Sequence, residues 1–360
     1  MIYSRVRQRC SGRQASRKAS VAVLVLWAIA LLAVFAIHIG AGVRQRLDFL
    51  ARIESRHDLR WIARAGVEKA LAELAVFENQ DNCIALRQSW SASPQLFSEI
   101  QVGRGFATVA AAYRTGDFKA AAGGDEGIQL RFGGEDEQAK LNLNTVPRQV
   151  LVRLFVELKA LDVDQAEELA AAIVDWRDAD NQSEAHGAED GYYHGLQPAS
   201  ECKDGPFESR EELLQVRGMT DALWRQLKPY LTIHGSGSVN INTAARPVLA
   251  ALGLSERLQE NVLVYRCGED GEPATADDRL FVNTTDIVAL ISQVTALSES
   301  EATELSAIVS QGQLTTSSQT FLFQSAGRLP ERQSRCLIQC IAEKSGEQIN
   351  VRQWRMNYIM

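Results

Sequence analysis

A crowded group of potential ligand atoms in this 360-residue sequence lies between Asp175 and Tyr193, in the stretch DWRDADNQSEAHGAEDGYY. Six carboxylates fall in this stretch, and no continuous apolar stripe runs through it. Carboxylates this close repel one another unless a proton, solvent or a cation relieves the repulsion. The segment is therefore expected to be exposed to solvent, to take part in acid–base chemistry or to bind a metal ion.

Calcium suits these residue types best, because Ca2+ is bound by about six to eight oxygens in a loop flexible enough to surround it. The end of a predicted helix and the returning chain supply such oxygens, and Gly187 is placed to let the chain turn back. The spacing differs from that of an EF-hand, so the site would be irregular. The predicted ligands are Asp178, Asp180, Asn181, Glu189 and Asp190.

Three other interpretations of the segment stay open from the residues alone. A solvated acidic loop needs no ligand at all. A zinc site at His186 and His194 would lack the usual zinc-binding pattern. An enzymatic acid–base pair lacks support, because the chain has no nucleophile motif, phosphate loop or cofactor fingerprint. We therefore expect a protein without catalytic activity.

The N-terminus has the charge pattern of a membrane anchor. Six basic residues and no acidic one precede Ala19, and an uncharged apolar run follows from Val21 to Ile39. This run is close to the length needed to cross a hydrocarbon core. The positive-inside bias places the start of the chain in the cytoplasm and exports the rest. A cleavable secretory signal is the alternative, but the run is long for one and no clear cleavage site follows it.

Beyond the apolar run, hydrophobic residues recur at helical spacing from Leu47 to Leu74. No proline occurs before Pro94, so the apolar run and this amphipathic stretch can form one long helix.

The rest of the chain reads as strands, then helices, then strands. GFATVAAAYRT and GIQLRFGG are typical of short strands, and a helical section extends from about Val146 to Gln311. Strands return in QTFLFQSAG, SRCLIQCIAEK and QINVRQWRMNY, the last two joined by a turn at Ser345 and Gly346. This order predicts an α+β fold, in which a large all-α domain is inserted into a long N-terminal helix and antiparallel sheet.

A weak internal repeat links Asn142–Thr145 and Asn240–Thr243, which are followed by Pro147 and Pro247. Threonine is a good N-cap, and proline is tolerated in the first turn of a helix because no helical donor is lost there. We interpret both motifs as helix entries capped by their threonines.

The same motif also occurs in helix-hairpin-helix DNA-binding modules, so a membrane-anchored DNA-binding protein is an alternative. Such a hairpin needs a Gly-apolar-Gly turn, whereas the turns at Gly218 and Gly253 have one glycine each. The net charge of −7 also argues against binding a polyanion. We expect no nucleic-acid partner.

Four stretches spaced along most of the chain resemble the K-type minor pseudopilins of type II secretion systems, in the order of that family. They are RKASVAVLVLWAIALL, LNLNTVPRQVL, IVDWRDADNQSEAHGAEDGYY and VNINTAARPVLAAL. The resemblance implies a pilin-like fold and calcium bound in the inserted helical domain. It also implies a subunit at the tip of a periplasmic pseudopilus, where it initiates or caps assembly for the export of folded proteins. A minor pilin of a type IV pilus is the alternative that shares the stem but not the acidic insert.

The resemblance also implies processing, location and partners. A prepilin peptidase would cut between Ala19 and Ser20, where the family normally has a glycine before the cut, and the new N-terminus would be methylated. Leu24 stands where major pseudopilins carry a glutamate that pairs with a neighbouring subunit. The protein is expected to cross the bacterial inner membrane once, with its bulk in the periplasm. Its expected partners are the minor pseudopilins of I-type, J-type and H-type. The amphipathic face from Leu47 to Leu74 is expected to pack on the stems of one or two of them.

These expectations divide the chain into five parts: a leader at 1–19, the transmembrane part of the N-terminal helix at 20–40, a first pilin-like part at 41–144, the inserted helical domain at 145–312, and C-terminal pilin-like strands at 313–360. Five of the six cysteines lie beyond the leader, so an odd number would leave at least one thiol unpaired.

Overall fold

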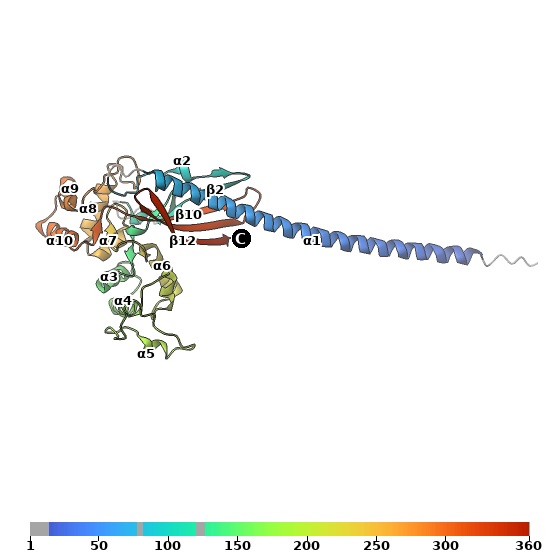
Figure 1. The fold of residues 1–360 in the computed structure, drawn as a ribbon, viewed down its shortest axis with the longest axis horizontal. Coiled ribbons are helices and arrows are strands. Elements are labelled where there is room, and N and C mark those ends of the chain that lie inside the picture. Colours follow the sequence, from blue (N-terminus) through green and yellow to red (C-terminus); the bar gives the residue numbers. More distant parts are fainter. Residues whose placement is uncertain (1–13, 78–81, 120–126, 360) are drawn as a thin grey trace, which may run out of the picture. The chain divides into compact units, whose positions relative to one another are not determined.

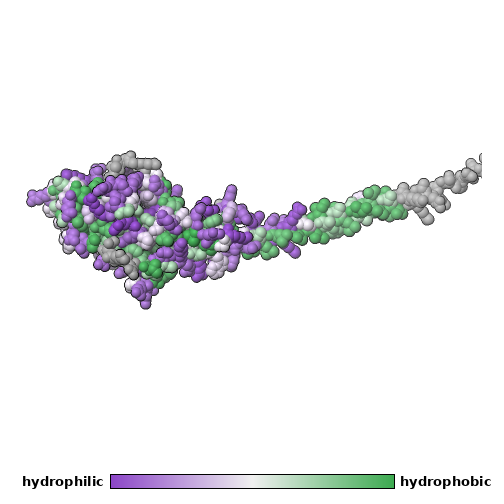
Figure 2. All heavy atoms as spheres, turned by 90° about the horizontal axis from the view of Figure 1, so that it is seen from above, coloured by the Kyte–Doolittle hydropathy of each residue, from purple (hydrophilic) through white to green (hydrophobic). Residues whose placement is uncertain are grey.

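The computed structural model describes residues 14–77, 82–119 and 127–359, with side chains from Val21 onward. Its first element is α1, a continuous helix over Gln14–Val76, as predicted. The chain divides into two units, the first ending at Asp58 and the second beginning at Leu59. The large apolar side chains of the first unit from Val21 to Ile53 are exposed (Figure 2). This part of α1 is long and apolar enough to cross a membrane, a test that a signal sequence also passes.

The predicted leader lies mostly outside the described residues. Ala19 and Ser20 fall within α1, in the part where only the backbone is described. The predicted cleavage between them therefore stays a prediction.

The second unit contains an antiparallel sheet in the order β1-β2-β10-β11-β12, with β5 also paired to β10 (Figure 1). The long strands come from the C-terminal end of the chain, where the turn at Gly346 has a φ of 61°. The strand bounds are β1 Ile100–Val102, β2 Gly105–Val109, β5 Glu135–Asp136, β10 Thr320–Arg328, β11 Arg335–Ser345 and β12 Gln348–Ile359. A separate antiparallel hairpin is formed by β3 Ala111–Arg114 and β4 Ile128–Arg131.

The last turns of α1 pack on this sheet, and a glycine allows them to approach closely. A Cβ at Gly327 in β10 would lie 2.5 Å from the Leu59 carbonyl oxygen and 2.7 Å from the Ala63 nitrogen. Leu59, Ile62 and Ala63 are buried there against alternate residues of β11. Burial of one helix face against one sheet face builds the apolar core of this half of the unit.

This packing corrects the expectation that the whole amphipathic face of α1 binds partner stems. From Leu59 to Leu74 the apolar face is used inside the protein, against its own sheet. Only the earlier positions of that face, Leu47, Leu50 and Ile53, are exposed. The apolar periodicity correctly predicted which residues form this face of α1, but it does not predict which surface packs against the face.

The helical part lies between β5 and β10 in the sequence and surrounds a second, larger core. Its helices are α3 Arg148–Glu157, α4 Val163–Arg177, α5 Asp190–Tyr193, α6 Asp221–Leu227, α7 Arg246–Leu252, α8 Glu256–Arg266, α9 Ile287–Val294 and α10 Glu299–Ser310. Short 3-10 helices are η1 Thr115–Asp117, η2 Glu137–Ala139, η3 Arg210–Gln215, η4 Lys228–Tyr230 and η5 Thr284–Asp286. The predicted α+β class is confirmed. The helices and the sheet share one compact unit, so the predicted boundaries at 145 and 312 stay predictions.

The two asparagine motifs form matching local structures. In the first motif, Asn144 donates to the Phe207 carbonyl at 3.0 Å and accepts from the Phe207 N–H at 2.7 Å. In the second, Asn242 makes the same two bonds to Phe281, both 2.9 Å long. Each asparagine thus connects the start of one helix pair to a distant loop. Its side chain satisfies the backbone N–H and carbonyl of a buried phenylalanine, which would otherwise lack hydrogen-bond partners.

The same correspondence extends to the helices and strands. Arg177 at the end of α4 donates to the carbonyls of Leu143 and Val146, and Arg266 at the end of α8 donates to the corresponding carbonyls of the second motif. Two short parallel strand pairs close the two halves: β6 Leu141–Asn142 with β7 Leu231–Thr232, and β8 Val239–Asn240 with β9 Leu314–Thr315. The helical part is therefore an internal duplication, and its two groups, α3, α4 and α6 and then α7 to α10, are visible in Figure 1.

The predicted threonine caps are wrong. The N-cap of α3 is Pro147 and that of α7 is Ala245, and neither side chain caps its helix. The Thr243 hydroxyl instead donates to the Asp136 carboxylate at 2.6 Å. In each motif the first asparagine accepts from the N–H two residues later, which closes a turn before the helix begins.

Candidate metal site

The acidic segment follows directly from α4, whose last turn is held by the Arg177 contacts described above. Asp175 is buried in that last turn, and Asp178 is the C-cap residue. The chain then loops back to the short helix α5, where the buried ring of Tyr193 packs edge-on against Trp176 at 5.3 Å. This contact brings the beginning and the end of the loop together.

Four carboxylates meet where the loop closes: Asp175, Asp178, Glu189 and Asp204, here called the acidic cluster. Glu189 is only 6% exposed, and no N–H or O–H group in the described part of the chain donates to its carboxylate, although the Cys202 thiol beside it lowers its pKa as a weak hydrogen-bond partner. One oxygen each of Asp178 and Asp204 is likewise buried without a partner among those residues. The ligand atoms of Glu189, Cys202 and Asp204 lie within 4.8 Å of one another. Unpartnered buried oxygens of Glu189 and Asp204 therefore lie close together, and Asp178 is near enough for its charge to raise the pKa of Glu189.

The pKa values of the carboxyl groups in the acidic cluster reflect their burial and mutual repulsion. Burial, followed by the charges of Asp175, Asp204 and Asp178, raises the pKa of Glu189 to about 7. Burial and the nearby charges of Asp180 and Asp175 also raise the pKa of Asp178. A buried carboxylate without a donor is costly, and the cost is relieved by a proton or a cation.

Asp175 shapes the loop as well as adding charge. Its carboxylate accepts from the Glu184 N–H at 3.0 Å and from the Ser183 hydroxyl at 3.3 Å. A Cβ at Gly187 would overlap this carboxylate, so the glycine is needed for close approach. The left-handed backbone that reverses the chain is at His186, with a φ of 69°, rather than at the glycine.

Cys202 lies beside the acidic cluster. Burial raises the pKa of its thiol to about 12, and its Sγ lies 3.7 Å from the Asp175 carbonyl oxygen. His186 and His194 are both exposed. The acidic cluster therefore offers mainly carboxylate oxygens, which suit a hard cation.

The structure brings two of the five predicted ligands, Asp178 and Glu189, into the acidic cluster. The other three hold the loop: Asp180 accepts from the Gln182 N–H at 2.9 Å, and Asn181 donates to Asp190 at 3.3 Å. Asp190 also accepts from the backbone N–H of Cys202 at 2.9 Å, which draws the later segment toward the acidic cluster.

Sequence reasoning missed Asp175 and Asp204 as members of the acidic cluster. Asp175 belongs to the quoted segment but reads as part of a helix. Asp204 lies outside the segment, and its signal was the short polar stretch ECKDG around it. The orphaned carboxylate oxygens suit Ca2+, which prefers carboxylate oxygens in irregular loops.

Comparisons with known proteins agree with this architecture. Residues 133–236, which contain the acidic cluster, match the family model for type II secretion system protein K. The type II secretion system protein K of Klebsiella pneumoniae is 30% identical over 241 residues, covering 66% of this chain and 69% of that protein. The corresponding protein of Pectobacterium carotovorum is 35% identical over 128 residues, covering 34% of this chain and 39% of that protein.

Among solved structures, the chain resembles the GspK–GspI–GspJ complex of the enterotoxigenic Escherichia coli type 2 secretion system. The TM-score is 0.62 at 18% identity, over 86% of this chain and 99% of the matched chain, which shows the shared fold. The resemblance inferred from the sequence motifs is thus confirmed, and the chain belongs to the type II secretion system protein K family.

Proposed function

We propose that this protein is the minor pseudopilin at the tip of a periplasmic pseudopilus, where it initiates or caps assembly for the export of folded proteins. The observation that carries the proposal is the duplicated helical part inserted between β5 and β10 of a helix-and-sheet unit. This helical part would add bulk to the end of the subunit away from the membrane, and it would obstruct the binding of another subunit above it. Membership of the type II secretion system protein K family supports the role of a minor pseudopilin.

Leu24 supports the tip position independently. The side chain stands on the exposed apolar surface of α1. A leucine cannot pair with the charged N-terminus of an adjoining subunit, as a glutamate would, and an unpaired carboxylate in lipid would be costly. The subunit is therefore suited to having neighbours below it and none above.

The proposed partners are the I-type and J-type minor pseudopilins, together with the H-type. The matched solved structure is a complex of K, I and J proteins. On this chain, β12 is an edge strand, and Trp354 and Met356 face the same side of the sheet as the buried Cys340 and Ile338 opposite them. Both are nevertheless more than a third exposed. This apolar strip beside α1 suits the stem helix of a pilin-like partner.

We further propose that the acidic cluster binds calcium. Asp178, Glu189 and Asp204 would supply buried oxygens, and Asp180, Asn181 and Asp190 would complete or position the loop. The ion would supply positive charge that offsets the mutual repulsion of these carboxylates. Binding to the folded state alone would stabilise the helical part.

The proposed location is the inner membrane, with α1 crossing once and the second unit in the periplasm. The proposed maturation is cleavage by a prepilin peptidase between Ala19 and Ser20, with methylation of the new terminus. The two alternatives are not favoured. The matched family is neither a DNA-binding nor a type IV pilus family.

The test is co-purification of the full chain with its sister I-type and J-type pseudopilins in detergent. We expect a stoichiometric complex by light scattering, and a Trp354→Asp variant that joins it at least tenfold more weakly. Asn357→Asp places the same charge on the opposite face of β12 and is the matched control. Failure of the wild-type chain to associate with either sister subunit would contradict the proposal.

A further inference from the structure

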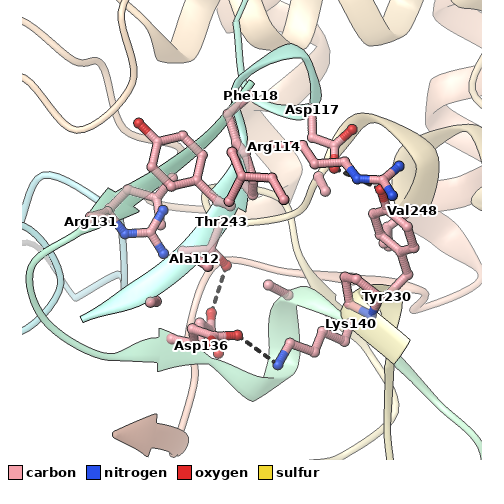
Figure 3. A pocket seen from close by; sticks show the side chains of 18 of the residues that line it. Ala112, Arg114, Asp117, Phe118, Arg131, Asp136, Lys140, Tyr230, Thr243 and Val248 are labelled. Carbon is pink, nitrogen blue, oxygen red and sulfur yellow. Dashed lines mark hydrogen bonds and ion pairs between the residues drawn. The ribbon is translucent and has the colours of Figure 1, made fainter. Parts of the chain in front are cut away.

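A cavity of about 270 Å3 lies between the β3–β4 hairpin, η2, η4 and the first turns of α7 (Figure 3). Small-molecule sites usually have volumes of about 300 Å3 or more, so this cavity is slightly smaller than most of them. Apolar wall is contributed by Ala112, Phe118, Ile128, Ala245 and Val248. The cavity lies away from the acidic cluster, and none of its lining residues belongs to that cluster.

Arg131 from β4 is one of the basic residues that line the cavity. Its Nε is buried without a hydrogen-bond partner in the described part of the chain. Its guanidinium lies over the rings of Tyr113 and Phe118, 5.5 and 5.9 Å from their centroids. Burial lowers the pKa of Arg131, and the charge of Glu135 opposes that effect. The rings orient the cation, and its Nε is left without a hydrogen-bond partner among the residues that the structure describes.

The carboxylates around the cavity are already occupied by other donors. Glu135 accepts from Lys140 at 3.0 Å and from Gln324 at 2.7 Å. Asp117 accepts from the Tyr230 hydroxyl at 2.7 Å. Asp136 accepts from four donors, namely the Gln138 N–H, the Asn240 amide and the hydroxyls of Thr243 and Ser318.

We infer that this cavity binds a small apolar monocarboxylate, whose carboxylate pairs with Arg131 and whose body lies on the apolar wall. A guanidinium presents parallel N–H donors that match a carboxylate, and such pairs are about twice as strong as neutral hydrogen bonds. In Figure 3 the Arg131 side chain lies at the cavity with Phe118 and Ala112 close by. The ligand is thus held at one end by charge and along its length by apolar contact.

Two sources carry this chemistry: a free short-chain acid and the C-terminal residue of a peptide. Hexanoate represents the first, and N-acetylleucine represents the second. Hexan-1-ol, hexylamine and N-acetylleucinamide keep the apolar bodies but remove the negative charge. Binding by hexanoate alone assigns a free acid, and binding by N-acetylleucine alone assigns a chain end; either result supports the shared chemistry.

The experiment is calorimetric titration of the full chain in detergent micelles, with titration into empty micelles as the blank. We expect saturable 1:1 binding of at least one acid. The uncharged or cationic analogues should bind about tenfold to a hundredfold more weakly, as expected for loss of a charged hydrogen bond. Arg131→Gln should weaken acid binding by a similar factor, and Arg332→Gln at an exposed position outside the cavity should leave it unchanged.

A second variant keeps the test decisive if Arg131→Gln disturbs the β3–β4 hairpin. Ala112 lines the cavity but is exposed, so Ala112→Phe should obstruct binding while leaving Arg131 and the core intact. The inference is overturned if neither acid binds saturably. Equal affinity for hexanoate and hexan-1-ol, or full binding by a folded Arg131→Gln variant, would overturn it as well.

Discussion

Replacing Glu189 by glutamine should change the stability of the protein in opposite directions with and without calcium. In chelator above pH 7, where Glu189 with its pKa of about 7 is ionised, the substitution removes a buried negative charge to which no described N–H or O–H group donates. The new amide can also donate to the orphaned oxygens of Asp178 and Asp204. In calcium, the same substitution removes a ligand with a full negative charge. A purely structural glutamate would give the same sign in both conditions.

The magnitudes follow from general energetics. Relief of an unsatisfied buried group is worth about 1–3 kcal/mol, so the chelated variant should be more stable than chelated wild type by about 1 kcal/mol or more. Calcium at a hundredfold excess over its Kd should stabilise wild type by about 2.7 kcal/mol. For a folded unit of this size, 1 kcal/mol shifts Tm by about 2 °C. Wild type should therefore gain about 5 °C with calcium, and the variant much less.

The assay is thermal unfolding of the full chain in detergent, with excess calcium and with chelator. Glu168→Gln on the exposed face of α4 is the matched control, and it should follow wild type in both conditions. The reasoning is refuted if wild type shows no response to calcium, or if Glu189→Gln is destabilised equally in calcium and in chelator.

Three further outcomes can be measured. Mass spectrometry of membrane-extracted protein should show a chain that begins at Ser20, and Ala19→Gly should increase the processed fraction; an intact leader in both would count against cleavage. Burial would raise the pKa of Glu137, but Lys140 and other donors lower it to about 2 from 4.5. The Glu137–Lys140 pair therefore stabilises the fold fully above pH 4.5 and loses its contribution as pH falls toward 2. The destabilisation caused by Glu137→Gln, measured by urea unfolding, should shrink over that pH range. A difference that stays constant with pH would contradict the role of this pair. Asp136→Ala should destabilise by about 3 kcal/mol in the same assay, because four buried donors lose their acceptor, and a change below about 0.5 kcal/mol would contradict the network.

Much of the fold could be predicted from local patterns. The apolar run, the continuous helix α1 and the strands β10, β11 and β12 follow from composition, periodicity and glycine turns. The duplication was visible only as two asparagine motifs. Its physical basis, the pairing of Asn144 and Asn242 with distant backbone groups, depends on contacts that no local pattern encodes.

The acidic cluster shows the same limit. The segment with concentrated charge was evident, but which carboxylates are buried without donors depends on how the loop closes. Asp204 joins the acidic cluster because Asp190 binds the backbone of Cys202, a contact between positions twelve residues apart. Similarly, Thr243 was expected to cap a helix, but its hydroxyl donates a hydrogen bond to the buried carboxylate of Asp136.

The tip assignment is tested most directly by immunogold labelling of pseudopili assembled from the major pseudopilin together with this protein. An epitope tag on the exposed turn at Gly346 gives one label site per subunit. We expect gold at one end of each fibre and no fibres when this protein is expressed alone. Gold along the whole fibre, or homopolymeric fibres of this protein, would contradict its position at the tip.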